Sequence, residues 1–202
     1  MDEKKSERPA SYLKENYGMI LGSYLPAELR QPGISSPRVL SVACGFALEL
    51  EGLQQVLPNS YIEAIDNADI AITGARGWNP DFPQERIRLV DATRSESFGN
   101  ENWDLIVVRN PNVGSSAIGV TAPWAEILKN CFDKLNPSGF LYLTTLSKIE
   151  MDGVLRFLSH FPLEDVTPND PNRTHVIYLP IEVGFPLIED YVAVLKKPAL
   201  PS

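Results

Sequence analysis

Small residues at the end of an apolar run are the first sign of chemistry in this sequence. The run VLSVA at 39–43 ends on Ala43, and Cys44 and Gly45 follow before the pattern becomes helical. Side chains this small let a ligand lie on backbone N–H groups and near the positive end of a helix. The turn therefore predicts a ligand-binding loop. A tight strand-to-helix turn without a ligand is the alternative.

Two acidic residues follow the next two apolar runs. Asp66 stands about 20 residues after Gly45, the spacing at which an acid accepts hydrogen bonds from ribose hydroxyls. The alternative is that Asp66 or Asn67 caps the following helix. Asp91 and Ala92 end the third run, where the carboxylate could accept from an adenine amino group while the Ala92 N–H meets a ring nitrogen. A simple turn aspartate explains Asp91 equally well.

A basic and polar pair, Arg109 and Asn110, ends the fourth run. Pro111 and a loop rich in glycine and serine follow it, and loops in such places often carry function. Arg109 is suited to bind a carboxylate or phosphate of a substrate. An ion pair with a nearby aspartate on the rim of the sheet is the alternative.

These residues need an alternating α/β framework to bring them together. The predicted strands are 39–43, 60–66, 86–92, 103–110 and 139–146, and the predicted helices are 48–57, 68–76, 123–135 and 149–161. Two further extended stretches, 174–182 and 189–197, are expected to pair antiparallel. In an open sheet of this kind, ligands bind outside the carboxyl ends of the strands.

Composition fits a single domain. The chain has 202 residues, of which 44% are hydrophobic, and no apolar stretch approaches the ~18 residues that span a bilayer. The formal net charge of −8 argues against a broad nucleic-acid surface. The cysteines and histidines have no metal-ligand spacing, so no metal site is expected. The N-terminus lacks an apolar signal core, and we expect a cytoplasmic protein.

Taken together, these segments resemble the class I S-adenosylmethionine-dependent methyltransferases. The resemblance covers roughly residues 36–197. The matching segments are VLSVACGFALEL, YIEAIDNADIA, RLVDATR, DLIVVRN and ILKNCFDKLNPSGFLYLTT. It implies an α/β, Rossmann-like three-layer sandwich with a seven-stranded, mostly parallel sheet and an antiparallel strand seven. The methyltransferase domain would span 36–202, after an N-terminal tail and helix at 1–35 that are a candidate lid.

The resemblance also implies a cofactor, a set of binding residues and a reaction. The cofactor would be S-adenosyl-L-methionine, and the acceptor is expected to be a small molecule rather than a nucleic acid. The implied cofactor-binding residues are Ala43, Cys44, Gly45, Phe46, Glu49, Asp66, Asn67, Asp91, Ala92, Arg109 and Asn110. Tyr12, Tyr17, Arg109 and Asn110 are candidates for contacting the substrate. No catalytic residue is identified, because displacement from an activated sulfonium depends mainly on positioning.

Departures from the family pattern affect the first motif. An acid and two glycines are usual where this chain has Ser41, Ala43 and Ala47. Ser41 cannot supply a carboxylate to the methionine amino group, and Glu49 is a candidate to replace it from the first helical turn. Cys44 is interpreted as a loop residue that packs against the cofactor. A cofactor-binding but catalytically silent protein, or a partner subunit, is therefore an alternative.

A dinucleotide-dependent oxidoreductase is a second alternative. Its fingerprint places glycines at positions 43, 45 and 48. This chain has Ala43 and Leu48 at two of them, and leucine opposes the close helix packing that the third glycine permits. The sequence therefore favours the methyltransferase.

Overall fold

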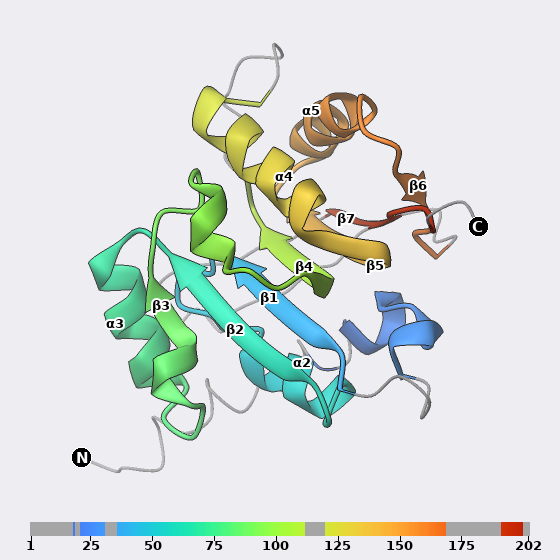
Figure 1. Cartoon of the computed structure of the whole chain (residues 1–202). Helices are drawn as coiled ribbons and strands as arrows, with labels where there is room; N and C mark the ends of the chain where they lie inside the picture. The colour runs from blue at the N-terminus through green and yellow to red at the C-terminus, as the bar shows by residue number, and fades with distance from the viewer. Residues whose placement is uncertain (1–17, 19–20, 31–35, 112–119, 169–190, 200–202) are drawn as a thin grey trace.

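A computed structural model describes residues 18, 21–30, 36–111, 120–168 and 191–199 (Figure 1). They form a seven-stranded sheet in the order β3-β2-β1-β4-β5-β7-β6. The strands are β1 (Arg38–Val42), β2 (Tyr61–Asp66), β3 (Ile87–Leu89), β4 (Trp103–Arg109), β5 (Leu135–Thr145), β6 (Glu164–Asp165) and β7 (Tyr191–Lys196). Strands β1 to β5 run parallel, and β7 runs antiparallel to both neighbours.

Helices cover both faces of this sheet and produce the three layers that the sequence predicts. They are α2 (Leu50–Val56), α3 (Asp69–Trp78), α4 (Ala122–Lys134) and α5 (Lys148–Leu158), with shorter 3-10 turns η2 (Ala27–Arg30), η3 (Gln84–Arg86) and η4 (Ser95–Phe98). Apolar side chains of α2, α3 and η2 share one buried cluster with one face of the sheet. Those of α4, α5 and η4 share the other cluster with the opposite face.

Burial on both faces explains why the central strands read as apolar runs without alternation. In β1, Val39 belongs to the cluster under α2, and Leu40 belongs to the cluster under α4. Successive side chains point to opposite faces, and parallel sheets are covered on both. Ser41 is therefore conspicuous as a polar side chain inside the sheet, on the same face as Val39.

Two predicted strands, β3 and β5, differ clearly from the structure at one end. Strand β3 is shorter than the predicted 86–92, so Asp91 and Ala92 lie beyond its end. Strand β5 begins at Leu135 rather than at 139. Leu135 pairs with Trp103 and Phe140 with Leu105, so the residues between them leave the register as an irregularity inside the strand. Ser138 lies within this irregularity and has a φ of 63°.

The two ends of the chain are described in part. Leu21, Leu25 and Leu29 are buried in the cluster under α2, so this N-terminal segment packs against the domain. The reversed final strand is confirmed as β7. It pairs with β6, which is not among the predicted strands, whereas the predicted strand 174–182 lies outside the described residues.

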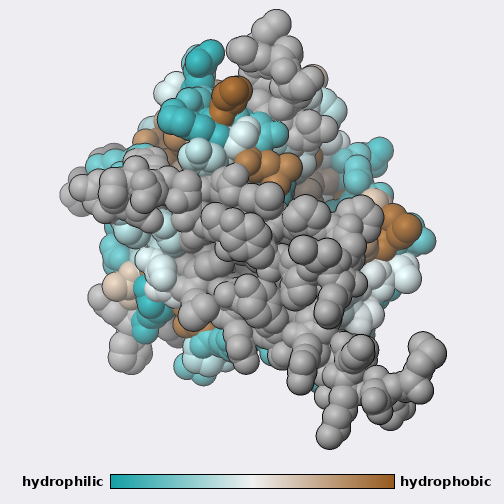
Figure 2. All heavy atoms as spheres, turned by 180° about the vertical axis from the view of Figure 1, so that it is seen from behind, coloured by the Kyte–Doolittle hydropathy of each residue, from teal (hydrophilic) through white to brown (hydrophobic). Residues whose placement is uncertain are grey.

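Most of the described surface is polar. The coloured residues on the face in Figure 2 are largely hydrophilic, with small separate hydrophobic spots. The large apolar side chains that the described residues expose are Phe46, Ile70, Leu89, Leu146 and Ile149. Across the described residues, we find no helix with the length and hydropathy that a bilayer span requires.

Candidate functional site

In the loop after β1, every second residue has a positive φ angle. Ala43, Gly45 and Ala47 have φ angles of 52°, 55° and 50°. This left-handed conformation is easy for glycine and costs other residues on the order of 1 kcal/mol. The positions that departed from the family's glycine pattern therefore keep the glycine conformation. The loop requires that conformation as well as small side chains.

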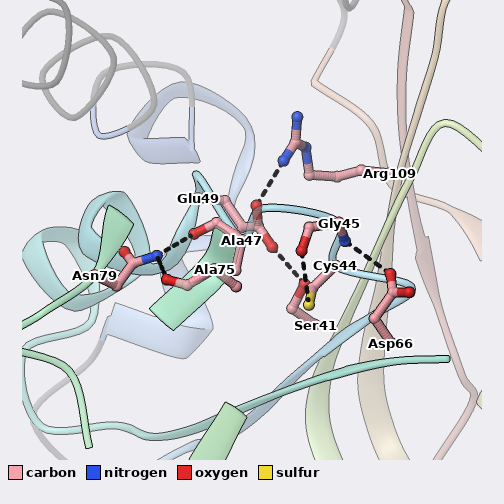
Figure 3. Close-up of polar contacts among 9 residues, drawn as sticks. All are labelled: Ser41, Cys44, Gly45, Ala47, Glu49, Asp66, Ala75, Asn79 and Arg109. Carbon is pink, nitrogen blue, oxygen red and sulfur yellow. Dashed lines mark hydrogen bonds and ion pairs between the residues drawn. The ribbon is translucent and has the colours of Figure 1, made fainter. Parts of the chain in front are cut away.

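Asp66 joins the end of β2 to this loop. Its Oδ2 accepts from the Gly45 N–H at 2.9 Å, and its Oδ1 accepts from the Ala68 N–H at 2.9 Å (Figure 3). The N-cap of α3 is Ala68, so the helix-capping alternative for Asp66 and Asn67 is wrong. A carboxylate has about four acceptor positions. Two hydrogen bonds leave Asp66 with capacity for two hydroxyl donors.

Glu49 forms the centre of a buried polar group. It is the N-cap residue of α2 and only 1% exposed. Its Oε1 accepts from the Ser41 hydroxyl, and its Oε2 accepts from Arg109 Nη1 at 2.6 Å (Figure 3). Arg109 thus pairs with an acid, but this acid is a glutamate at the start of α2 rather than the aspartate on the rim of the sheet that one alternative proposed. Carboxylate, hydroxyl and guanidinium meet at the ends of β1 and β4.

Asn79, which sequence reasoning missed, holds the loop from a third direction. It is the C-cap residue of α3, and its side-chain amide donates to the Ala47 carbonyl at 3.2 Å and to the Ala75 carbonyl at 2.8 Å (Figure 3). The amide is buried, so these bonds fix the loop where Ala47 adopts its positive φ. The sequence signal for Asn79 was its place near the end of a predicted helix, and asparagines at such places are common.

Cys44 is buried in the loop, and its packing against a cofactor stays a prediction. Burial raises the pKa of its thiol well above the usual range, and the carboxylates of Glu49 and Asp66 raise it further. The thiol is therefore protonated near neutral pH, and the thiolate is the nucleophilic form of cysteine. The Cys44 N–H donates to the Ile65 carbonyl at 3.0 Å and attaches the loop to β2.

Phe46 is nearly half exposed and lies on α3. A β-carbon on Gly74 would stand 2.3 Å from its ring, so glycine at position 74 makes room for it. Asn67 is exposed just beyond β2, and Asn110 follows β4 with φ 48°. The Asn110 N–H donates to the Thr144 carbonyl at 2.9 Å. Tyr12 and Tyr17 lie outside the described residues.

Asp91 and Ala92 occupy the loop beyond β3. Oδ1 of Asp91 accepts from the Thr93 N–H at 3.0 Å and from the Thr93 hydroxyl at 2.7 Å. These two bonds hold the pKa of Asp91 below its usual range. Asn130, buried in α4, donates to the Ala92 and Thr93 carbonyls at 3.1 and 3.0 Å and fixes the loop to the helix layer.

The predicted residues therefore gather along one edge of the sheet. In strand order, this edge carries Asp91 beyond β3, Asp66 at the end of β2, the left-handed loop after β1, and Arg109 at the end of β4. This is the carboxyl edge, where open α/β sheets bind ligands. The reversed β7 between β5 and β6 departs from the strand order of dinucleotide-binding domains.

Comparison by structure finds related folds at low sequence identity. An S-adenosylmethionine-dependent methyltransferase from Clostridium acetobutylicum superimposes with a TM-score of 0.60 and 13% identity, over 93% of this chain and 92% of that one. The N-methyltransferase NodS from Bradyrhizobium japonicum, in complex with S-adenosyl-L-homocysteine, gives 0.57 and 15%, over 93% and 88%. The chain has the class I methyltransferase fold.

Acceptors differ among the proteins that share the fold. An rRNA methylase from Streptococcus thermophilus matches with a TM-score of 0.54 and 13% identity, over 94% of this chain and 93% of that one. No protein-family model and no curated protein sequence matches this chain. Because the identities are low, function has to be argued from the site itself.

Proposed function

We propose that this chain is an S-adenosylmethionine-dependent methyltransferase that acts on a small molecule. The observation that carries the proposal is the bond between the Asp66 carboxylate and the Gly45 N–H. It closes a left-handed loop over the carboxyl edge of the sheet and leaves acceptor positions on Asp66. A nucleoside with two neighbouring hydroxyls matches those positions.

The neighbouring loop suits the base of the same nucleoside. Asp91 is an acceptor for an exocyclic amino group, and Thr93 favours its ionised form. Asn130 holds the Ala92 backbone in place, so the Ala92 N–H is positioned to meet a ring nitrogen. Once bound, the cofactor would supply a methyl group on a sulfonium. The methyl carbon would bond to a lone pair of the acceptor as the S–CH₃ bond breaks, and S-adenosylhomocysteine would be the leaving group. The protein positions both partners and excludes water.

Charge near the site supports a small acceptor. In the described part of the rim, cations close to the strand ends are paired with acids: Arg109 with Glu49, and Lys148 with Asp152. A nucleic-acid acceptor calls for a concentration of cations facing phosphates. The net charge of −8 agrees with this. We also propose that the segment 1–35, with Tyr12 and Tyr17, covers the acceptor, while Leu21, Leu25 and Leu29 within it stay packed in the cluster under α2.

Thermal unfolding with three ligands tests the cofactor assignment. Saturation with S-adenosylmethionine or S-adenosylhomocysteine at about 100 times Kd contributes ~2.7 kcal/mol. For a chain of this size, that raises Tm by roughly 5–10 °C. NADH should give no shift. Asp66→Ala should lose most of the shift relative to its own unliganded Tm, whereas Asp81→Ala, which removes an exposed acid, should retain it.

Two results would contradict the proposal. A shift with NADH alone would assign the site to a dinucleotide. A shift with the sulfur cofactors, but no S-adenosylhomocysteine formed across a broad panel of amine, hydroxyl and thiol acceptors, would favour a cofactor-binding protein without methyltransferase activity.

A further inference from the structure

Three polar side chains share one face of the sheet at its carboxyl edge. Side chains alternate along a strand, so Ser41 lies on the face of Val39, and Arg109 on the face of Val107. Thr144 is the register partner of Arg109 and therefore points to the same face. Apolar residues of the cluster under α2 occupy the rest of this face. Ser41, Arg109 and Thr144, together with Glu49, are called the polar cluster below.

Glu49 links two members of this cluster. It bonds both Ser41 and Arg109 while it is only 1% exposed. A buried ion pair stabilises a fold weakly, because the loss of hydration offsets much of the attraction. The Glu49 carboxylate accepts one bond on each oxygen, which leaves about two of its acceptor positions. The cluster is thus costly for the fold and has capacity for another donor.

Thr144 gives an independent indication of a ligand at the same place. Its side chain is 1% exposed, and its hydroxyl has no hydrogen-bond partner among the described residues. A buried hydroxyl without a partner costs free energy, and most such groups in proteins are paired. Thr144 lies beside Arg109 across the β4–β5 pairing. The hydroxyl is therefore placed to bond a group that enters from the edge of the sheet.

The sheet order decides which part of a bound cofactor would meet this cluster. Asp91 lies beyond β3 and Asp66 ends β2, both on one side of β1 in the strand order. Arg109 ends β4 on the other side of β1, and Glu49 is bonded to it. A ligand whose base and ribose occupy β3 and β2 therefore extends its remaining end over β1 and β4. In S-adenosylmethionine, that end is an α-amino acid.

We propose that Glu49 and Arg109 bind the two charges of the cofactor's amino-acid end. Glu49 accepts from the ammonium group, Arg109 donates to the carboxylate, and the Thr144 hydroxyl donates a further bond to it. This rests on the proposed cofactor function. Ser41, which stands where the family has an acid, orients the replacement carboxylate by donating to it. The acid has moved from the strand to the N-cap of α2.

Calorimetry with truncated ligands tests this on the unmodified protein. The probes are S-adenosylhomocysteine, its analogue without the α-amino group, and methylthioadenosine, which lacks the whole amino-acid end. A hydrogen bond between charged groups changes affinity roughly 10–100-fold. S-adenosylhomocysteine should therefore bind that much more tightly than its deamino analogue, and methylthioadenosine should bind no better than the analogue.

Variants assign the effect to residues. Glu49→Gln should lower the ratio between the affinities for S-adenosylhomocysteine and its deamino analogue. The variant should bind the two ligands within about 3-fold of each other, because a neutral amide attracts an ammonium weakly. Methylthioadenosine binding should not change, which also shows that the variant folds. Ser41→Asp combined with Glu49→Gln restores a carboxylate from the strand and should recover most of the ratio.

Thr144 has a matched control in its neighbour. Thr144→Val should weaken S-adenosylhomocysteine roughly 3–10-fold through a lost hydrogen bond, without lowering Tm. Thr145 is also buried, but it points to the other face and donates to the Ser147 carbonyl at 2.9 Å. Thr145→Val should lower Tm and leave the affinity unchanged.

The outcomes separate this inference from the proposed function. The inference is wrong if the deamino analogue binds as tightly as S-adenosylhomocysteine. It is also wrong if Glu49→Gln keeps the full ratio between the affinities for these two ligands. In either case, the polar cluster has only a structural role. The adenosine site would still stand if methylthioadenosine binds. If none of the three ligands binds, the proposed function fails as well.

Discussion

At the scale of single residues, the loop after β1 shows how conformation can persist where glycine is absent. Ala43 and Ala47 adopt positive φ angles, as Gly45 does. Each alanine costs about 1 kcal/mol there because its β-carbon crowds the following carbonyl. Asp66 and Asn79 hold the loop on two sides. The surrounding contacts therefore maintain a backbone that the local sequence disfavours.

Relieving this strain should stabilise the protein. Ala43→Gly should raise the free energy of unfolding by about 0.5–1 kcal/mol, after the extra entropy of glycine in the unfolded chain is subtracted. Urea unfolding measures the change, and Tm should rise by roughly 2–4 °C per kcal/mol. Ala125→Gly, in the interior of α4, should lower stability by a similar amount. A loss of stability in Ala43→Gly would contradict the strain.

The charge of Asp91 gives a second prediction at this scale. The Thr93 N–H and hydroxyl hold the pKa of Asp91 below that of the unfolded chain, which is about 3.9. Its contribution to stability is therefore present above that value and is lost as pH falls through the lower folded pKa. In Thr93→Val, NMR titration should show the pKa of Asp91 moving upward. Thr167→Val, which removes an equivalent bond to Asp165, should leave Asp91 unchanged.

At the scale of elements, helix ends and loops are fixed by side chains from neighbouring segments. Asn79 closes α3 and holds the loop after β1, and Asn130 in α4 holds the loop beyond β3. Lys197, just after β7, donates to the Phe132 and Leu135 carbonyls at 2.9 and 2.8 Å and so closes the end of α4. The layers are therefore connected by specific polar bonds as well as by apolar packing.

The start of α5 offers the clearest test of such a bond. The Ser147 hydroxyl accepts from the Glu150 N–H at 3.3 Å and donates to the Glu150 carboxylate at 3.0 Å. Ser147→Ala should cost about 0.5–2 kcal/mol of stability, measured by urea unfolding. Ser159→Ala removes an exposed hydroxyl at the other end of α5 and should cost less than about 0.5 kcal/mol. Equal losses would show that the cap contributes nothing.

At the scale of the whole molecule, stability depends on a sheet that is covered on both faces. Leu141 in β5 is 0% exposed, whereas Leu146, shortly after the strand, is 47% exposed. Leu141→Ala should cost about 2–5 kcal/mol through lost burial and a residual cavity. Leu146→Ala should cost less than about 0.5 kcal/mol. Urea unfolding compares the two, and similar losses would be inconsistent with the layers described.

Much of this architecture could be predicted from the sequence. Apolar runs without alternation predicted five parallel strands, because a strand that is buried on both faces of the sheet needs apolar side chains on both. Asp66 and Asp91 were located because the ends of parallel strands meet at one edge. The helix from 148 to 158 was predicted within a few residues at each end. These features depend on residues close together in the chain.

Only the tertiary structure decided how the site is connected. Glu49 reaches Arg109 across 60 positions, and Asn79 reaches Ala47 across 32. Asp66 could equally have capped a helix until α3 was seen to have Ala68 as its N-cap. Periodicity records which face of an element is buried, but hydrogen bonds between distant segments depend on how the layers pack. The sequence therefore determined the framework and the edge, and packing determined which side chains meet there.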